Sequence, residues 1–325
     1  MLARCLGRHS EVYKFEELHF FEQYIDVDVL DAPPTLTRDK AIALAQRLLT
    51  TARNGLFAKV TPQQHRREAE EITENTQPLN ALTIYNNILV SETKAHDKRI
   101  PLEQTPRYLF AAEEILAAYP NAQMINLIRD PRDVMLSQKN RWKRSLYSDG
   151  KVPLIWTLRS WANYHAYLTP RIWVGAVNMA KKMQSHPRFH SFHYEEILRE
   201  PKACLQDICS RVDIKLEDTL FEVRQIGSST GQDKPNMTGF DASRIGAWQR
   251  GGLKPAEIAI CENIAREAMT QAGYRFSSTA TPFIGGLLEK VTLLPKVGIA
   301  TLLNLGRFKN VGKLVRRRLS VQSAK

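Results

Sequence analysis

The chain has 325 residues, of which 43% are apolar and 25% are charged, with 16 glycines and 16 prolines. This composition is typical of a globular protein and excludes a collagen-like, coiled-coil or wholly disordered chain. The 46 basic residues outnumber the 34 acidic residues by 12, and residues 289–325 supply +8 of this excess, with nine bases and one acid. The remaining 288 residues therefore carry only +4, as expected of an enzyme with a polyanionic ligand.

Sequence features also indicate the cellular location of the protein. The sequence contains no run of 18 apolar residues, so no transmembrane helix is expected, and the first residues lack the apolar core of a signal peptide. Four cysteines form no CxxC pair, which favours reduced thiols in a cytoplasmic protein. The histidines are scattered, so we expect no metal site. The basic residues of the tail have few interleaved aromatic residues, which argues against nucleic-acid binding.

In chain order, helical and extended patterns alternate. Apolar residues recur at helical spacing over 38–54, and Thr105 followed by Pro106 is a helix-start signal. The expected helices cover 1–9, 38–54, 79–92, 105–118, a segment from 130, 154–168, 201–212 and 255–272. The expected strands cover 11–16, 99–103, 124–128 and 189–194. This alternation predicts an α/β fold in three layers, a mostly parallel sheet with helices on both faces.

The most informative segment is MINLIRDPRDVMLS, residues 124–137. Its apolar start predicts a buried strand that delivers Arg129 at the carboxyl end, where open α/β sheets bind ligands. Asp130 and Pro131 suit the start of the next helix, whose backbone amides favour a nearby anion. The segment therefore predicts an anion site.

Two side chains of this segment suit a phosphate. Arg129 has a planar fork, and Ser137 lies about 10 Å along the helix at a rise of about 1.5 Å per residue, within reach of a long arginine. A purely structural interpretation stays open, in which Arg129 pairs with Asp133 and Ser137 faces solvent.

Five segments, in the right order, resemble the sulfotransferases that use 3′-phosphoadenosine 5′-phosphosulfate (PAPS). The segment from Arg129 to Ser137 resembles their 3′-phosphate-binding segment. Glu17–Phe21 (ELHFF) and Glu103–Pro106 (EQTP) resemble segments of the carbohydrate and heparan-type branch. Tyr194–Leu198 (YEEIL), with Pro201 after it, resembles the strand-to-helix turn of the family. Arg244–Trp248 (RIGAW), with Leu253 and a helix ending near Tyr274, resembles the late nucleotide-contacting loop and last helix. The resemblance covers about residues 1–275 and implies the P-loop NTPase-like sulfotransferase fold.

The resemblance also implies roles for individual residues. Glu17 is expected to be the catalytic base, with His19 orienting it or the acceptor. Arg129, Ser137 and Arg244 are expected to hold the 3′-phosphate of PAPS. Trp248 is expected either to lie near the adenosine or to pack in the core, and Tyr194 is counted with the cofactor-binding residues, although with Glu195 it serves chiefly the architecture.

Glu16 competes with Glu17 for the role of base. Neighbouring side chains of an extended segment point to opposite faces, so only one of the two should face a ligand. Without the family resemblance, EELHFFEQY would be interpreted as a half-buried surface segment.

Two departures from the family pattern stand out. The 5′-phosphosulfate loop, a strand followed by a Ser-Gly-Thr-Thr type turn, should precede the helix that begins at Met1, and it is missing together with that first strand. Gln104 stands where the family has lysine, and an amide donates hydrogen bonds but cannot neutralise charge.

The leading hypothesis is therefore a PAPS-dependent sulfotransferase acting on a hydroxyl, or an amine, of a carbohydrate-containing or other small acceptor. The alternative is a catalytically impaired sulfotransferase-like protein that binds a nucleotide or a partner and associates with membranes through its tail. A P-loop kinase relative is disfavoured, because GxxxxGK[ST] does not occur.

The domain organisation predicted is a sulfotransferase-like domain over 1–278 and a basic amphipathic extension over 279–325. The extension mixes leucine, isoleucine and valine with cations, which is typical of a segment that lies on an anionic membrane surface or docks on a partner. We expect residues 283–325 to contact the anionic membrane surface, so that a cytoplasmic protein associates peripherally with the membrane. The competing interpretation is a helix packed on the domain, followed by a solvated basic end.

Overall fold

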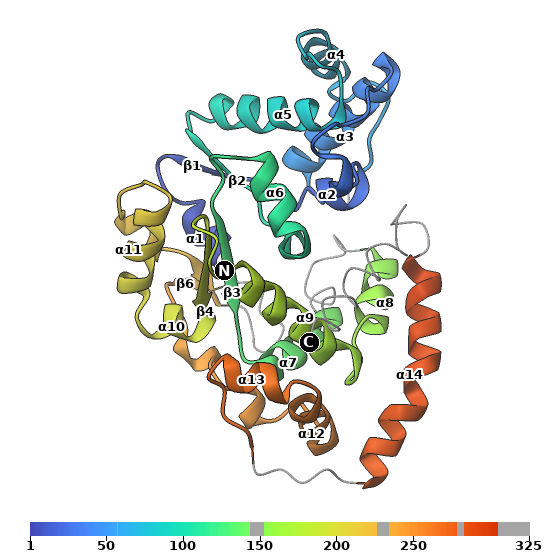
Figure 1. Cartoon of the computed structure of the whole chain (residues 1–325), viewed down its shortest axis with the longest axis vertical. Helices are drawn as coiled ribbons and strands as arrows, with labels where there is room; N and C mark the ends of the chain where they lie inside the picture. The colour runs from blue at the N-terminus through green and yellow to red at the C-terminus, as the bar shows by residue number, and fades with distance from the viewer. Residues whose placement is uncertain (57, 144–152, 226–233, 278–282, 305–325) are drawn as a thin grey trace. The chain divides into compact units, whose positions relative to one another are not determined.

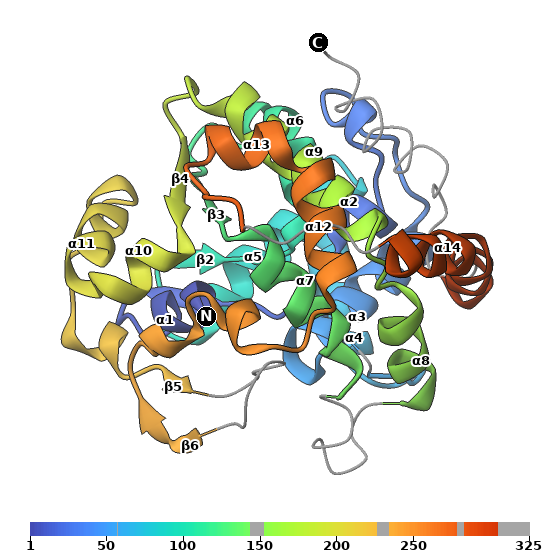
Figure 2. The same cartoon turned by 90° about the horizontal axis from the view of Figure 1, so that it is seen from below.

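The structure, a computed structural model, describes residues 1–56, 58–143, 153–225, 234–277 and 283–304. The chain forms two compact units: unit 1 comprises residues 1–123 and 209–223, and unit 2 comprises residues 124–208 and those from 224 onward. Helices alternate with short strands in both units (Figures 1 and 2), so the predicted α/β class is confirmed. The predicted boundary between 278 and 279 lies outside the described residues.

Unit 1 is mostly helical. Its elements are α1 (Leu2–Leu6), β1 (Val12–Lys14), α2 (Phe20–Gln23), η1 (Val27–Val29), α3 (Arg38–Asn54), α4 (Arg66–Glu74), α5 (Ala81–Ala95), β2 (Ile100–Leu102), η2 (Pro106–Ala111), α6 (Ala112–Ala118) and η4 (Asp218–Phe221). The helix predicted over 38–54 is confirmed as α3, which packs against α4 and α5. It ends at Gly55, whose φ of 84° is one that glycine adopts without strain.

Unit 2 holds the remaining elements. They are β3 (Met124–Ile128), α7 (Pro131–Lys139), α8 (Leu154–Ala162), α9 (Leu168–Met183), β4 (Phe189–His193), α10 (Tyr194–Arg199), α11 (Pro201–Arg211, whose last turn belongs to unit 1), β5 (Arg224–Gln225), β6 (Lys234–Thr238), η5 (Ala242–Arg244), η6 (Ala247–Arg250), α12 (Pro255–Ile264), α13 (Arg266–Gln271) and α14 (Phe283–Asn304).

The described strands form three two-stranded sheets. The pairs β1–β2 and β3–β4 are parallel, with Val12 opposite Ile100 and Met124 opposite Phe189, whereas β5–β6 is antiparallel. The prediction that β3 is buried is wrong, because its residues are half-exposed and Leu127 is 36% exposed. Within the described residues β3 pairs with β4 alone, so its other edge has no strand partner there.

Several element boundaries differ from the predictions. The helix expected over 154–168 ends at Ala162, because the chain then turns to bury Tyr164, whose hydroxyl donates to Glu257 over 2.7 Å. The helix expected over 105–118 begins as the 3₁₀ turn η2, and the one expected over 255–272 breaks between α12 and α13.

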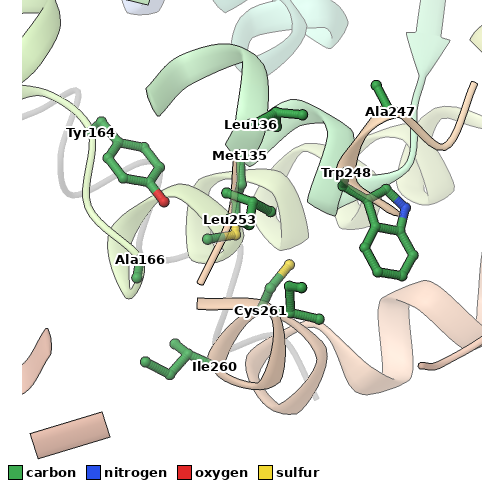
Figure 3. Packing of buried hydrophobic residues seen from close by; sticks show 10 residues of the cluster. Met135, Leu136, Tyr164, Ala166, Ala247, Trp248, Leu253, Ile260 and Cys261 are labelled. Carbon is green, nitrogen blue, oxygen red and sulfur yellow. The ribbon is translucent and has the colours of Figure 1, made fainter. Parts of the chain in front are cut away.

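The core of unit 2 gathers around α7 and α12. Buried side chains of both helices meet residues from the turn after α8 and from the loop before α12 (Figure 3). The cluster comprises Met135, Leu136, Tyr164, Ala166, Ala247, Trp248, Leu253, Ile258, Ile260 and Cys261. This packing fixes α7, the helix that follows Arg129, against the segment that contains Trp248.

Candidate functional site

In unit 1, residues 18–20 are held by side chains from the segment 103–108. The backbone N–H of Leu18 donates to Glu103 Oε1 over 3.0 Å, and that of Phe20 donates to the Tyr108 hydroxyl over 2.8 Å. Between them, the N–H of His19 approaches Thr105 Oγ1 at 3.4 Å. Three successive amides are thus bound by side chains some 85 positions away, which positions the neighbouring Glu17.

His19 lies between two carboxylates. Its Nδ1 is 2.8 Å from Glu22 Oε2, and its Nε2 is 3.3 Å from Glu17 Oε2. Glu22 is buried and also lies 3.4 Å from Nη1 of Arg107. The backbone of His19 is in the left-handed region, with φ 52° and ψ 30°, a conformation that costs free energy in a residue other than glycine and is common at functional sites.

The charge state of His19 follows from these contacts. Burial opposes the positive charge, but the hydrogen bonds and the negative charges of Glu17 and Glu22 outweigh it and raise the pKa of His19 to about 9. His19 is therefore protonated at neutral pH, both ring nitrogens act as donors, and it has no lone pair for a proton. Of this group, Glu17 is the more accessible acid, with a side chain 39% exposed against 4% for Glu22.

The competitor Glu16 has different surroundings. Its side chain is 57% exposed and lies 3.0 Å from Nζ of Lys14. Glu17 instead contacts His19, so the structure places the two neighbouring carboxylates in separate groups, as the alternation of an extended segment predicts.

Glu103 is a second titratable group in this cluster. Burial raises its pKa to about 7, against the hydrogen bonds that it accepts from Thr105 and Leu18. Its Oε2 atom is buried and has no hydrogen-bond partner among the described residues. The carboxyl group of Glu103 thus anchors residues 18–20, and it ionises near neutral pH.

In unit 2, Arg129 follows β3 and its guanidinium lies 4.5 Å from the ring centroid of Tyr194. Nη2 of Arg129 donates a hydrogen bond to the carbonyl oxygen of Arg244 over 3.2 Å and lies 3.6 Å from Oδ2 of Asp133, with which it forms an ion pair. Its Nε atom is buried and has no hydrogen-bond partner within the described part of the chain. Arg129, Tyr194 and Arg244, three of the predicted cofactor-binding residues, are therefore brought together.

Asp133 fixes the segment that contains Arg244 and Trp248. Its carboxylate accepts from the backbone N–H of Gly246 and of Trp248, each over 3.0 Å. The pairing of Arg129 with Asp133, left open by the sequence, is thus present, although Asp133 is also engaged with this loop. Burial raises the pKa of Asp133, against the lowering effect of Arg129 and of the two amides.

The remaining predicted residues lie around this group. Trp248 is 8% exposed and packs in the core of unit 2. Ser137 is half-buried on α7. Glu195 accepts from the backbone N–H of Asp130 (2.9 Å) and from the hydroxyl of Tyr274 (3.0 Å), so it joins α10 to the start of α7.

Sequence reasoning missed two participants. Glu22 lies three residues after His19, a spacing at which helical side chains meet, so this pair could have been found from the sequence. Arg107 gave no such signal, because its contact depends on how residues 103–108 pack against 18–20. No group of three or more metal-ligating side chains occurs within the described ranges.

Comparison with known proteins gives the family. The model of the sulfotransferase family matches residues 1–218. Among solved structures, a sulfotransferase domain from the curacin biosynthetic pathway shares 18% identity over 85% of this chain and 93% of its own, with a TM-score of 0.49. A sulfotransferase domain of the Synechococcus PCC 7002 olefin synthase shares 17% identity over 85% and 90%, with a TM-score of 0.49. No curated protein matches. Since the family model covers about two thirds of the sequence, this chain belongs to the sulfotransferase family.

Proposed function

We propose that this protein transfers a sulfuryl group from PAPS to a hydroxyl, or an amine, of a carbohydrate-containing or other small acceptor. Two observations support the proposal. The chain belongs to the sulfotransferase family, and the buried Nε atom of Arg129 has no hydrogen-bond partner among the residues that the structure describes. A guanidinium N–H without a partner in its own surroundings suits a phosphate oxygen.

The task of unit 2 is to hold the 3′-phosphate of PAPS. Arg129 supplies the charged fork. Arg244, whose backbone carbonyl accepts from Arg129 and whose Nε lies 3.4 Å from Asp241, supplies a second cation. Ser137 belongs to the same helix as Asp133 and adds a hydroxyl donor. The ring of Tyr194 stacks on the guanidinium of Arg129 and holds it in one orientation. The arginine side chain therefore loses less conformational entropy when it binds an anion.

The task of unit 1 is to remove a proton from the acceptor. Glu17 is the base, because it is accessible and His19 is already protonated. Its carboxylate takes the acceptor's proton as the acceptor oxygen bonds to sulfur and the bond from sulfur to the 5′-phosphate oxygen breaks. His19 is a positioning residue that holds Glu17. Proton removal by a general base such as Glu17 typically increases the rate ~10²–10⁴-fold.

The first test separates binding from turnover. Calorimetric titration with 3′-phosphoadenosine 5′-phosphate should give tight binding for the wild type and affinity at least about 10-fold weaker for Arg129→Gln, which loses a charge-assisted contact. Arg171→Gln removes the same charge from an exposed position on α9 and should bind as the wild type does. Equal affinities for all three proteins would exclude Arg129 as the phosphate ligand.

The second test uses radiolabelled PAPS with a panel of sugars and small alcohols. Glu17→Gln should lower kcat by ~10²–10⁴ and leave the affinity for the 3′,5′-bisphosphate nearly unchanged, whereas Glu16→Gln should resemble the wild type. If Glu16→Gln is the inactive variant, the base is Glu16. Nucleotide binding without transfer to any acceptor would favour the alternative, a sulfotransferase-like protein that binds without catalysis.

A further inference from the structure

Helix α14 directs apolar side chains toward solvent. Leu294 is 78% exposed, Leu302 70% and Val291 66%, and Leu287 and Leu288 are more than half exposed. Val291 lies four residues after Leu287 and three after Leu288, Leu294 three after Val291, and Leu302 eight after Leu294, so these residues form one stripe along the helix. We call the stripe Leu287, Leu288, Val291, Leu294 and Leu302 the outer face of α14.

The opposite face of α14 is held to unit 2 by polar contacts. Glu289 lies 3.3 Å from Nζ of Lys254, and Nζ of Lys296 donates to the carbonyl of Tyr164 over 3.0 Å. Nε of Arg159 on α8 donates to the carbonyl of Leu303 over 2.6 Å. A helix on a globular domain usually packs its apolar stripe inward and leaves its charges in water. In α14 the most exposed side chains are instead leucines and a valine, and Glu289 and Lys296 contact unit 2.

The neighbouring helix α8 adds to the same apolar surface. Helices α8 and α14 pack against each other, side by side in Figures 1 and 2. Leu154 on α8 is 74% exposed, Leu158 45% and Trp161 44%, and the ring of Trp161 lies 4.7 Å from Nζ of Lys296. Two packed helices that both expose leucines are unusual on a surface in water and mark an interaction site.

Charge decides which partner suits this surface. Residues 305–325, directly after α14, contain seven bases and no acid: Arg307, Lys309, Lys313, Arg316, Arg317, Arg318 and Lys325. A second copy of the chain would carry the same positive charge and be repelled. An anionic lipid surface instead offers hydrocarbon to the leucines and negative headgroups to the bases.

We propose that the outer face of α14, together with the exposed leucines and Trp161 of α8, lies in the plane of an anionic membrane surface. Within the described ranges, no helix is long and apolar enough to cross a bilayer, and α14 itself carries Glu289, Lys290 and Lys296 near its middle. The helix therefore binds along the interface, with its polar contacts to unit 2 kept.

The test measures binding of the full chain to vesicles. The wild type should sediment with mixed phosphatidylcholine and phosphatidylglycerol vesicles, and far less with phosphatidylcholine alone or in high salt. Leu287→Gln/Leu294→Gln, which leaves the charge unchanged, should weaken binding on the order of 10-fold or more, because two leucines no longer enter the bilayer. The control Val90→Gln/Ile172→Gln alters exposed apolar residues of α5 and α9 and should bind as the wild type does.

A second measurement guards against unfolding of the variants. Lipids brominated along their chains should quench the fluorescence of the wild type, and Trp161→Phe should lose much of that quenching while it still sediments. Equal vesicle binding by the leucine variant and the wild type would overturn the proposal. So would a wild type that is dimeric, ignores vesicles and becomes monomeric when the two leucines are replaced, since the face would then join two copies.

Discussion

The guanidinium of Arg132 lies over the ring of Trp248, with its central carbon 4.0 Å from the ring centroid. The same arginine makes two hydrogen bonds to Asp130 (3.0 and 2.7 Å) and one to Glu262 (2.7 Å). Trp248 therefore has one face covered by a cation that belongs to the protein, and it packs between α7 and the loop held by Asp133. The resemblance to other sulfotransferases left its role open between adenosine contact and core packing.

This relationship leads to the first prediction. Arg132→Lys keeps the charge but loses the planar stack and the two-pronged contact with Asp130, so we expect thermal unfolding of unit 2 to require about 1–3 kcal/mol less free energy. Tryptophan fluorescence is the suitable measurement, because all five tryptophans belong to unit 2. Arg171→Lys on the exposed side of α9 is the matched control. Unchanged stability in Arg132→Lys would show that the stack contributes nothing.

The second prediction concerns Glu22 and the charge of His19. Glu22→Gln removes one of the two anions that raise the pKa of His19 to about 9, so that pKa should fall by about one unit or more. Titration of the imidazole followed by nuclear magnetic resonance measures this directly. Glu16→Gln, which does not contact His19, should leave its pKa in place. If Glu22→Gln has no effect, the short contact to Nδ1 is not an ion pair.

A third prediction concerns pH and the stability of unit 1. The pKa of His19 is about 9 in the folded chain and near 6.5 when unfolded, so its favourable contribution is complete below pH 6.5 and is lost as the pH rises through 9. That contribution amounts to at most about 3 kcal/mol. Hydrogen exchange of amides in unit 1 should therefore accelerate between pH 7 and 9 beyond the intrinsic pH effect. His19→Asn, which tolerates the left-handed backbone, should lose this excess. An unaltered pH dependence in His19→Asn would contradict the assignment.

The fourth prediction concerns Glu103, whose ionisation should also lower the stability of unit 1 as the pH rises, but over a lower pH range than that of His19. Burial raises the pKa of Glu103 from 4.5 to about 7, so the folded chain keeps a proton that the unfolded chain has released. Stability should therefore fall as the pH rises from 4.5 to 7. Glu103→Gln still accepts a hydrogen bond from Leu18 but cannot ionise, so its stability relative to the wild type should be greater at pH 8 than at pH 4. Hydrogen exchange of the amides of residues 18–20 measures the difference, and equal differences at both pH values would refute it.

Local patterns predicted much of the secondary structure. The apolar period of 38–54 and the run MINLI gave α3 and β3 with their observed ends, because both signals depend only on neighbours in sequence. Helix α9 was not predicted, although Thr169 followed by Pro170 near its start is the same helix-start pair as Thr105 followed by Pro106. The partial exposure of β3 was also missed, since it depends on which strands flank it and not on its own residues.

The site was predictable to a lesser degree. Motif resemblance singled out Glu17, His19 and Arg129, and the structure surrounds each with charged or aromatic partners. Of the side chains that bind residues 18–20, Glu103 and Thr105 belong to a short segment of family resemblance to which no contact was assigned, and Tyr108 lies outside that segment. Hydrogen bonds between segments about 85 residues apart leave no periodic trace in either one.

Those hydrogen bonds constrain how the sequence can change. The amides of residues 18–20 have acceptors only as long as the chain near 103–108 offers a carboxylate and two hydroxyls at the right positions. A single insertion in either stretch would offset every donor from its acceptor and leave buried N–H groups unsatisfied. Homologues of this protein should therefore vary in length outside these two stretches, whereas an insertion or deletion within either stretch should abolish activity.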